Sequence, residues 1–273
     1  TGRLFIGLAL VLSVLLGGLL RASERNPEVI TQLAGVGPVQ TLGNLQYVEV
    51  NTSPEQAPAK QLLIFVHGTP GSLTAFETYL RDPLMRQRFH MISVTRPGWV
   101  HPDDVKQEML GEQALALEPL LRKNQSTKGA LLMGHSYGGP VVARTAMDFP
   151  ELVAGMVLVA STGDPQLSGP RWYNRFAMVL PRFILGADLK GANAEILALK
   201  PQLINMLPRW QDLQIPVLIV QGSDDKLVHP ANADFLQSVL VNASVTRINR
   251  EDMGHFVLWQ EASLIRDNIL SLF

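Results

Sequence analysis

The chain of 273 residues contains no cysteine. Disulfide bonds and a thiol nucleophile are therefore excluded, although the absence of cysteine does not identify a cellular compartment. The six histidines are scattered and none belongs to an H-x-x-x-H pair, so we expect neither a metal nor another cofactor. Lys and Arg number 23 and Asp and Glu number 24, which gives a net charge of -1 and predicts no nucleic-acid partner.

Charge is also absent from residues 4–20, where Ser13 is the only polar side chain. A helix of this length spans about 25 Å, which is at the short end of what crosses a bilayer. Three interpretations compete: a signal-anchor helix, an uncleaved signal peptide, and an apolar helix buried against the protein or in a dimer. Residues 20–22 (L-R-A) make a poor cleavage site, so we expect residues 1–21 to associate with a membrane and the rest of the chain to lie outside the cytoplasm.

Short apolar runs alternate with helical patterns along most of the chain. Residues 22–45 are interpreted as a polar connector and residues 46–50 as an edge strand with one face in water. The buried strands are predicted at residues 62–66, 90–94, 128–133, 156–160 and 216–220, with a further strand at 244–249. This alternation predicts an α/β fold with a mostly parallel central sheet flanked by helices.

The alternation is interrupted once, between residues 161 and 215. This segment has no strand pattern, but apolar residues recur in it at helical spacing, among them Ile204 and Leu207. We predict a helical cap at 161–215 inserted into a core formed by residues 22–160 and 216–273. Its aromatic and methionine residues favour a lipophilic roof over a site, and the candidate substrate-binding residues are Trp99, Trp172 and Phe176.

The motif G-H-S-Y-G at residues 134–138 stands between a predicted strand and a predicted helix. That context is typical of a nucleophile elbow, in which a strained turn exposes the hydroxyl of Ser136 above the sheet. A side chain at Gly134 or Gly138 would collide with the neighbouring strand or helix. Because a serine hydroxyl is a poor nucleophile by itself, Ser136 needs a histidine base and a carboxylate that orients this histidine.

Two histidines follow Ser136, and we favour His255 as the base because it lies in a loop between the last predicted strand and the last helix. His229 precedes Pro230 at a helix start and is interpreted as a surface or capping residue. In proteins with a nucleophile elbow the acid and the base follow the serine along the chain. His67 precedes Ser136, so a structural hydrogen-bonding role is the better interpretation for it.

From residue 62 to the C-terminus, cap excepted, the order of these motifs resembles that of the α/β-hydrolase superfamily. The family commonly carries G-x-x-D-x-x-V after the strand that ends here at Val220, which aligns its acid with Asp225. Asp224, its neighbour, and Asp164, in the loop after the preceding strand, are the alternatives. The resemblance also implies an oxyanion hole formed by the backbone N–H groups of Tyr137 and of Thr69, the latter in the H-G-x-P turn at residues 67–70.

One family motif is altered, because the turn often written D-R-P-G-x-G is T-R-P-G-W-V at residues 95–100. We expect this departure to affect the shape of the pocket. Family branches that open epoxides or displace halide use aspartate at the elbow, and Ser136 argues against both.

The resemblance implies a serine hydrolase that acts through an acyl-enzyme, and the composition of the predicted cap favours carboxylic esters of small or medium lipophilic substrates. Thioesterase, C–C bond hydrolase and cofactor-free peroxidase activities use the same triad and stay open, because fold and triad do not choose among them. A binding protein without catalysis is the alternative from another class. The expected partner is a small lipophilic molecule.

Overall fold

The computed structural model describes residues 30–51, 59–101, 104–169, 174 and 186–273. The chain divides into two units, Thr1–Ile30 and Thr31–Phe273, and the second contains the whole sheet. The predicted apolar segment at residues 1–21 lies outside the described residues, as do Trp172 and Phe176, so the predictions for them stay predictions. Among the residues that are described, no helix combines the length and the apolar character needed to span a bilayer.

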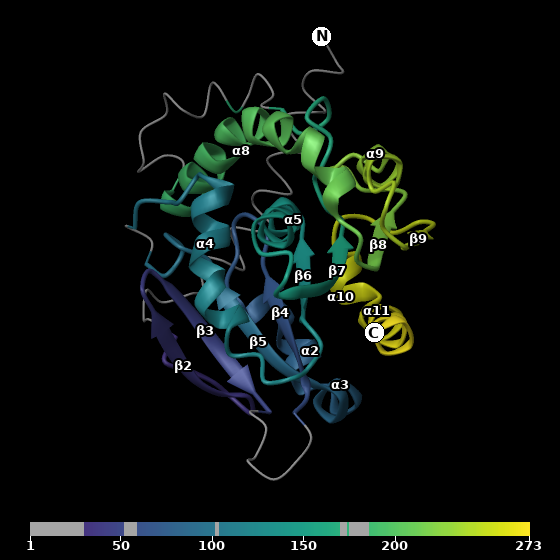
Figure 1. The fold of residues 1–273 in the computed structure, drawn as a ribbon. Helices are drawn as coiled ribbons and strands as arrows, with labels where there is room; N and C mark the ends of the chain where they lie inside the picture. Colours follow the sequence, from purple (N-terminus) through teal and green to yellow (C-terminus); the bar gives the residue numbers. More distant parts are fainter. Residues whose placement is uncertain (1–29, 52–58, 102–103, 170–173, 175–185) are drawn as a thin grey trace. The chain divides into compact units, whose positions relative to one another are not determined.

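A nine-stranded sheet forms the centre of the second unit, with the order β1-β2-β3-β5-β4-β6-β7-β8-β9 (Figure 1). The six strands β4 to β9 pair in parallel, whereas β1, β2 and β3 pair antiparallel and β3 joins the parallel part beside β5. The predicted fold class is confirmed. The bounds of the strands are β1 Gln32–Leu33, β2 Gly37–Leu42, β3 Leu45–Val50, β4 Gln61–Val66, β5 Phe89–Thr95, β6 Ala130–His135, β7 Val153–Val159, β8 Val217–Gly222 and β9 Val245–Arg250.

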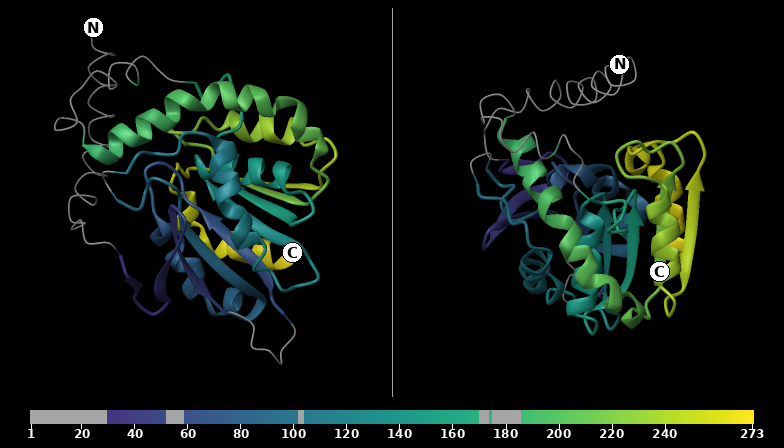
Figure 2. Two further views of the ribbon diagram at one scale, coloured as in Figure 1. Left: turned by 60° about the vertical axis from the view of Figure 1, so that its left-hand side comes forward. Right: turned by 90° about the horizontal axis from the view of Figure 1, so that it is seen from above.

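Helices cover both faces of this sheet, and every residue of β4, β5 and β6 is buried as a result. One face packs its apolar side chains against α4 (Leu110–Leu121), α5 (Gly138–Asp148), α8 (Ala187–Met206), η2 (Leu207–Asp212) and α9 (Ala231–Val239). The other face packs against η1 (Leu73–Phe76), α2 (Glu77–Arg81), α3 (Pro83–Arg88), α10 (Val257–Gln260) and α11 (Ala262–Leu272). Figure 2 shows the long helix α8, in green, on the same side as α4 and α5.

The N-terminal part of the sheet differs from its prediction. The described part of residues 22–45 forms β1 and β2, so the connector interpretation is wrong for it. The edge-strand interpretation of residues 46–50 is also wrong, because β3 lies between β2 and β5 and five of its six residues are buried. The tight turn between β2 and β3 uses Gly43 at φ 58, a conformation that favours glycine. Pairing with β5 covers the second edge of β3, and packing on both sides of the sheet buries its two faces, which local alternation cannot reveal.

Within the predicted cap the structure has α8 and η2, which together run from residue 187 to residue 212 between β7 and β8, while residues 161–169 form a loop with turns. The buried side of α8 follows the predicted apolar stripe only in part, since Leu199 and Met206 are buried but Ile204 is 45% exposed, and Leu207, at the start of η2, is 40% exposed. Its buried residues recur every three or four positions, and a carboxylate belongs to them: Ala192, Glu195, Leu199, Leu203 and Met206. The division of the chain into a core and a cap at residues 161–215 stays a prediction.

Candidate active site

Ser136 occupies the turn between β6 and α5 and has φ 55, in the left-handed region that residues other than glycine seldom adopt. Its N–H donates to the carbonyl oxygen of Val159 at 3.0 Å, and its own carbonyl accepts from Gly139 at 3.1 Å. These bonds tie the strained residue to the end of β7 and to the first turn of α5. Held backbone strain of this kind is a recurrent feature of functional sites.

The glycines on either side of Ser136 are required by close backbone approach. A Cβ atom on Gly134 would lie 2.4 Å from the carbonyl oxygen of Gly138. A Cβ atom on Gly138 would lie 2.2 Å from the carbonyl oxygen of Val66, at the end of β4. Both distances are shorter than any real contact of a Cβ atom, so the predicted reason for these two glycines is confirmed.

Asp225 and His255 form a buried pair at the carboxyl ends of β8 and β9. Nδ1 of His255 lies 2.8 Å from Oδ2 of Asp225, and the residues are 9% and 4% exposed. The other carboxylate oxygen accepts the N–H groups of Leu227 and Val228, each at 2.9 Å. Burial opposes ionisation of Asp225, but the hydrogen bonds from His255 and these N–H groups outweigh it and hold its pKa below the ordinary value.

His135 brings His255 beside the nucleophile turn. The two imidazole rings have centroids 4.8 Å apart, and Nε2 of His135 lies 3.2 Å from the carbonyl oxygen of His255. Burial, aided by the nearby His255, lowers the pKa of His135 to about 3, so it is neutral and donates this bond. Since His135 directly precedes Ser136, the structure gathers Ser136, His255 and Asp225 at one edge of the sheet.

The alternative residues are placed elsewhere. The side chain of Asp224 is 62% exposed and lies 3.8 Å from the ammonium of Lys226. Asp164 accepts the N–H of Gln166 at 2.7 Å, which closes a local turn. His229 is exposed, and its Nδ1 accepts the N–H of Ala231 at the start of α9, as the capping interpretation predicts.

The H-G-x-P turn lies directly against the elbow, because a Cβ atom on Gly68 would lie 2.9 Å from the Cβ atom of Ser136. Tyr137 is the N-cap residue of α5, a position where backbone N–H groups have no partner inside the helix. The hydroxyl of Thr69 is buried and has no hydrogen-bond partner among the described residues. The roles of the Thr69 and Tyr137 N–H groups as oxyanion donors stay predictions.

His67 is fully buried, and its ring is held by the surrounding backbone. The N–H of Arg96 donates to Nε2 at 3.0 Å, so the ring proton is on Nδ1, which donates to the carbonyl oxygen of Gly68 at 2.7 Å. A single neutral tautomer satisfies both bonds. His67 therefore has the structural hydrogen-bonding role predicted for it.

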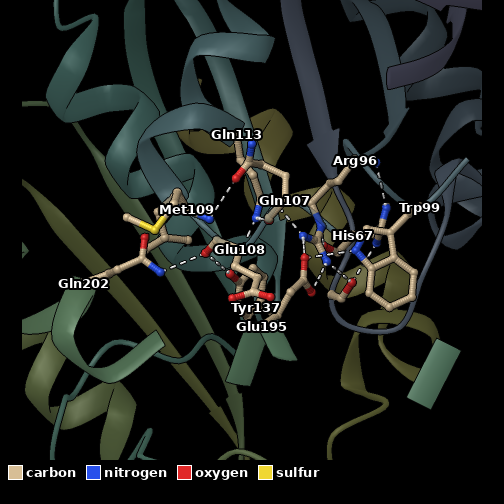
Figure 3. Close-up of polar contacts among 12 residues, drawn as sticks. His67, Arg96, Trp99, Gln107, Glu108, Met109, Gln113, Tyr137, Glu195 and Gln202 are labelled. Carbon is tan, nitrogen blue, oxygen red and sulfur yellow. Dashed lines mark hydrogen bonds and ion pairs between the residues drawn. The ribbon is translucent and has the colours of Figure 1, made fainter. Parts of the chain in front are cut away.

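Two charged residues that the sequence did not single out meet next to this turn (Figure 3). The guanidinium of Arg96, in the R-P-G turn after β5, forms two hydrogen bonds with the carboxylate of Glu195, at 2.6 and 3.0 Å. Both side chains are fully buried, at 1% and 0% exposure. No sequence signal marked Glu195, because only the packed position of α8 shows that it lies on the buried side, where a carboxylate needs a partner.

Trp99 belongs to the same cluster, and its indole N–H donates to Oε1 of Glu195 at 3.0 Å. Its ring also lies under the ammonium of Lys106, 4.4 Å from the ring centroid. These contacts fix the indole beside the turn, and substrate contact by Trp99 stays a prediction. Within the described residues, no group of three or more His, Asp or Glu side chains could hold a metal ion.

Residues 63–266 match the model of the alpha/beta hydrolase family. Because this match covers well over half of the chain, the protein belongs to the alpha/beta hydrolase family. It is 30% identical over 116 residues to the uncharacterized hydrolase YugF of Bacillus subtilis, a match that covers 42% of each chain. It is also 30% identical over 130 residues to the 1-acylglycerol-3-phosphate O-acyltransferase of Arabidopsis thaliana, which is 45% of this chain and 30% of the relative.

The chain thus spans less than half the length of these curated relatives. Among solved structures, a bacterial membrane phospholipase A superposes with a TM-score of 0.56 and 19% identity. That superposition covers 98% of this chain and 99% of the phospholipase. At this level of identity the likeness shows the common fold.

Proposed function

We propose that the protein is a serine hydrolase that cleaves lipophilic carboxylic esters through an acyl-enzyme. The observation that supports this most directly is the 2.8 Å hydrogen bond between Asp225 and His255 beside a strained serine turn. In this proposal Ser136 attacks the ester carbonyl, and the Thr69 and Tyr137 N–H groups stabilise the oxyanion. Water then attacks the acyl-enzyme and releases the acid.

The hydrogen-bond pattern of His255 determines how the proton moves. Nδ1 donates to Asp225, so the lone pair of a neutral ring is on Nε2, which is the nitrogen that accepts the proton of Ser136. His255 then returns this proton to the leaving alcohol. The lowered pKa of Asp225 keeps its carboxylate charged at neutral pH, and this charge stabilises the imidazolium that forms in between.

The choice of an ester with a lipophilic acyl group has two supports. The predicted cap is rich in aromatic residues and methionine, which suits an apolar substrate. One relative is named for acyl transfer to a glycerophosphate, and one structural neighbour is named a phospholipase, so both names refer to lipid acyl chemistry.

A fluorophosphonate probe tests the nucleophile. We expect one covalent adduct on Ser136, found by mass spectrometry of the intact folded protein and of its peptides. Ser136→Ala should lose both the adduct and ester turnover, because the proposal assigns the attack to the Ser136 hydroxyl. A folded wild-type protein that forms no adduct and turns over no ester would contradict the enzyme proposal and favour a binding protein.

A panel of p-nitrophenyl esters, acyl thioesters and amides of graded chain length tests the substrate class. We expect the highest kcat/KM for esters, with a preference for chains longer than acetyl. Higher kcat/KM for thioesters of the same acyl groups would contradict the ester proposal and leave the triad intact.

We further propose that residues 4–20 bring the enzyme to a membrane, where lipophilic esters are concentrated. Deletion of residues 1–21 should release a soluble protein with unchanged kcat on a soluble ester, and the full chain should sediment with vesicles. An insoluble or inactive product would favour the third interpretation, in which this segment packs into the fold.

A further inference from the structure

The peptide unit between Gly68 and Thr69 is held from its carbonyl side. The carbonyl oxygen of Gly68 accepts two hydrogen bonds, from Nδ1 of His67 at 2.7 Å and from Nη2 of Arg96 at 2.9 Å. This peptide bond is trans, so its C=O and N–H groups lie in one plane and point in opposite directions. Fixing the oxygen of Gly68 therefore fixes the direction of the Thr69 N–H, and it also polarises that N–H as a donor.

Arg96 makes this contact as one part of a fully satisfied guanidinium. Besides the bond to Gly68, Nε donates to the carbonyl oxygen of His67 at 3.0 Å and Nη1 donates to Gln113 at 2.7 Å. The remaining two N–H groups reach the two oxygens of Glu195. All five donors of the fork are thus used, which leaves the side chain a single orientation.

Glu195 orients the Arg96 guanidinium from a distant part of the chain, because it projects from α8, within the segment between β7 and β8. A fully buried carboxylate and a fully buried guanidinium carry a large desolvation cost, and apolar residues of similar volume often replace such pairs without loss of stability. The pair is therefore poorly explained as a source of stability alone. Its geometry links α8 to the turn beside Ser136.

We infer that α8 orients the Thr69 N–H for catalysis through Glu195, Arg96 and the carbonyl oxygen of Gly68. This inference rests on the proposed function, since it requires Thr69 to be an oxyanion donor. Glu195 and Arg96 are positioning residues and do not touch the reacting atoms. A displacement of α8 that opens the Arg96–Glu195 contact would release the turn, so that the seating of α8 and the reactivity of Ser136 are coupled.

The test is a comparison of Glu195→Gln with the wild-type protein. Gln keeps the shape of the side chain but removes the charge and one acceptor, and Arg96 retains its three other acceptors, so the fold should survive. We expect kcat per titrated active site to fall about 10-fold with KM within about twofold, because the loss of a whole oxyanion donor costs about 100-fold or more. The affinity for a trifluoromethyl ketone, which forms a tetrahedral adduct on Ser136, should fall by the same factor as kcat/KM.

Arg209→Gln is the matched control. Arg209 also joins the segment between β7 and β8 to the core, through Asp148 at 2.7 Å, but it does so at the far end of α5 from Ser136. The Arg209→Gln substitution should lower the melting temperature without changing kcat or inhibitor affinity. If Glu195→Gln does not fold, Arg96→Lys provides the same measurement, because an ammonium keeps the charge but cannot hold Gly68 and Glu195 together in a planar fork.

Each outcome decides between the two proposals. If the wild-type protein is active and Glu195→Gln has the same kcat and inhibitor affinity, even at a lower melting temperature, the inference is overturned and the serine hydrolase proposal stands. A wild-type protein without adduct or ester turnover would overturn both.

Discussion

Two buried carboxylate–imidazole pairs in this protein have nearly the same geometry. In one pair the imidazole of His255 lies 2.8 Å from Asp225, and in the other the imidazole of His90 lies 2.7 Å from Glu49. All four residues are buried or nearly so. The pairs differ in where the parallel sheet places them, because His255 follows the carboxyl end of β9 while His90 is the second residue of β5, at its amino end.

The surroundings of the two pairs differ as well. His255 lies against His135 and the strained turn of Ser136, and no hydrogen bond among the described residues uses its Nε2. The carboxylate of Glu49 has a second charged partner, since its other oxygen accepts from the ammonium of Lys123 at 2.7 Å. We conclude that a carboxylate–histidine pair is a candidate for catalysis at the carboxyl edge of the sheet, where loops and an exposed nucleophile meet, and contributes to the fold at the amino edge.

The largest expected difference between the two pairs is in turnover. Asp225→Asn should lower kcat about 10,000-fold, because the amide favours the wrong tautomer of His255 and cannot stabilise its charged form. Glu49→Gln should leave kcat within about twofold and lower the free energy of unfolding by about 3 kcal/mol, since it removes the charged partner of Lys123 and the carboxylate that the buried His90 contacts. Steady-state kinetics and urea unfolding measure the two effects. A loss of turnover in Glu49→Gln at full folding would remove the distinction.

A second difference is expected in the acid dependence of stability. The hydrogen bond with His90, and the further one with Lys123, lower the pKa of Glu49 from 4.5 to about 2. Because the pKa of the folded state is the lower one, the contribution of Glu49 is complete above pH 4.5 and is lost as the pH falls toward about 2. This change amounts to about 3 kcal/mol.

Urea unfolding between pH 6 and pH 2.5 measures this contribution. The gap in stability between the wild-type protein and Glu49→Gln should narrow as the pH falls. A gap that stays constant over this range would show that the Glu49 carboxylate is not specifically stabilised in the folded state.

The smallest expected effect sharpens the assignment of the acid. Asp224→Asn should change neither kcat nor stability by a measurable amount, because its side chain is largely exposed and its contact with Lys226 is long. The same kinetic assay as for Asp225→Asn measures it. A severe loss in Asp224→Asn together with an active Asp225→Asn would reverse the assignment.

Local sequence patterns predicted the elements that carry strong local signals. Residues 62–66 and 216–220 are continuous apolar runs, and they form the buried parallel strands β4 and β8. The glycines around Ser136 mark a turn whose close contacts are short-range. Local alternation failed at residues 46–50, because distant parts of the chain cover both faces of β3 and its second edge pairs with β5, some forty residues away.

Two members of the predicted apolar stripe failed for a related reason. Ile204 and Leu207 are as apolar as their buried neighbours, and only the packed position of the helix decides which side faces the core. Glu195 is the clearest case, since a glutamate in a helical segment is ordinarily assigned to solvent. The altered R-P-G turn was expected to affect pocket shape alone, whereas its Arg96 also holds the backbone of the H-G-x-P turn.

The sequence alone determined the α/β class, the strand–turn–helix context of Ser136 and the chain order of serine, aspartate and histidine. These features depend on contacts within a few residues or on residue type, so they can be read without coordinates. The tertiary structure alone decided that Asp225 and not Asp224 faces His255, that His90 pairs with Glu49 away from the nucleophile, and that Glu195 reaches Arg96. Each of these depends on which distant segments pack together, because the free energy of burying a charge is set by the partner that packing supplies.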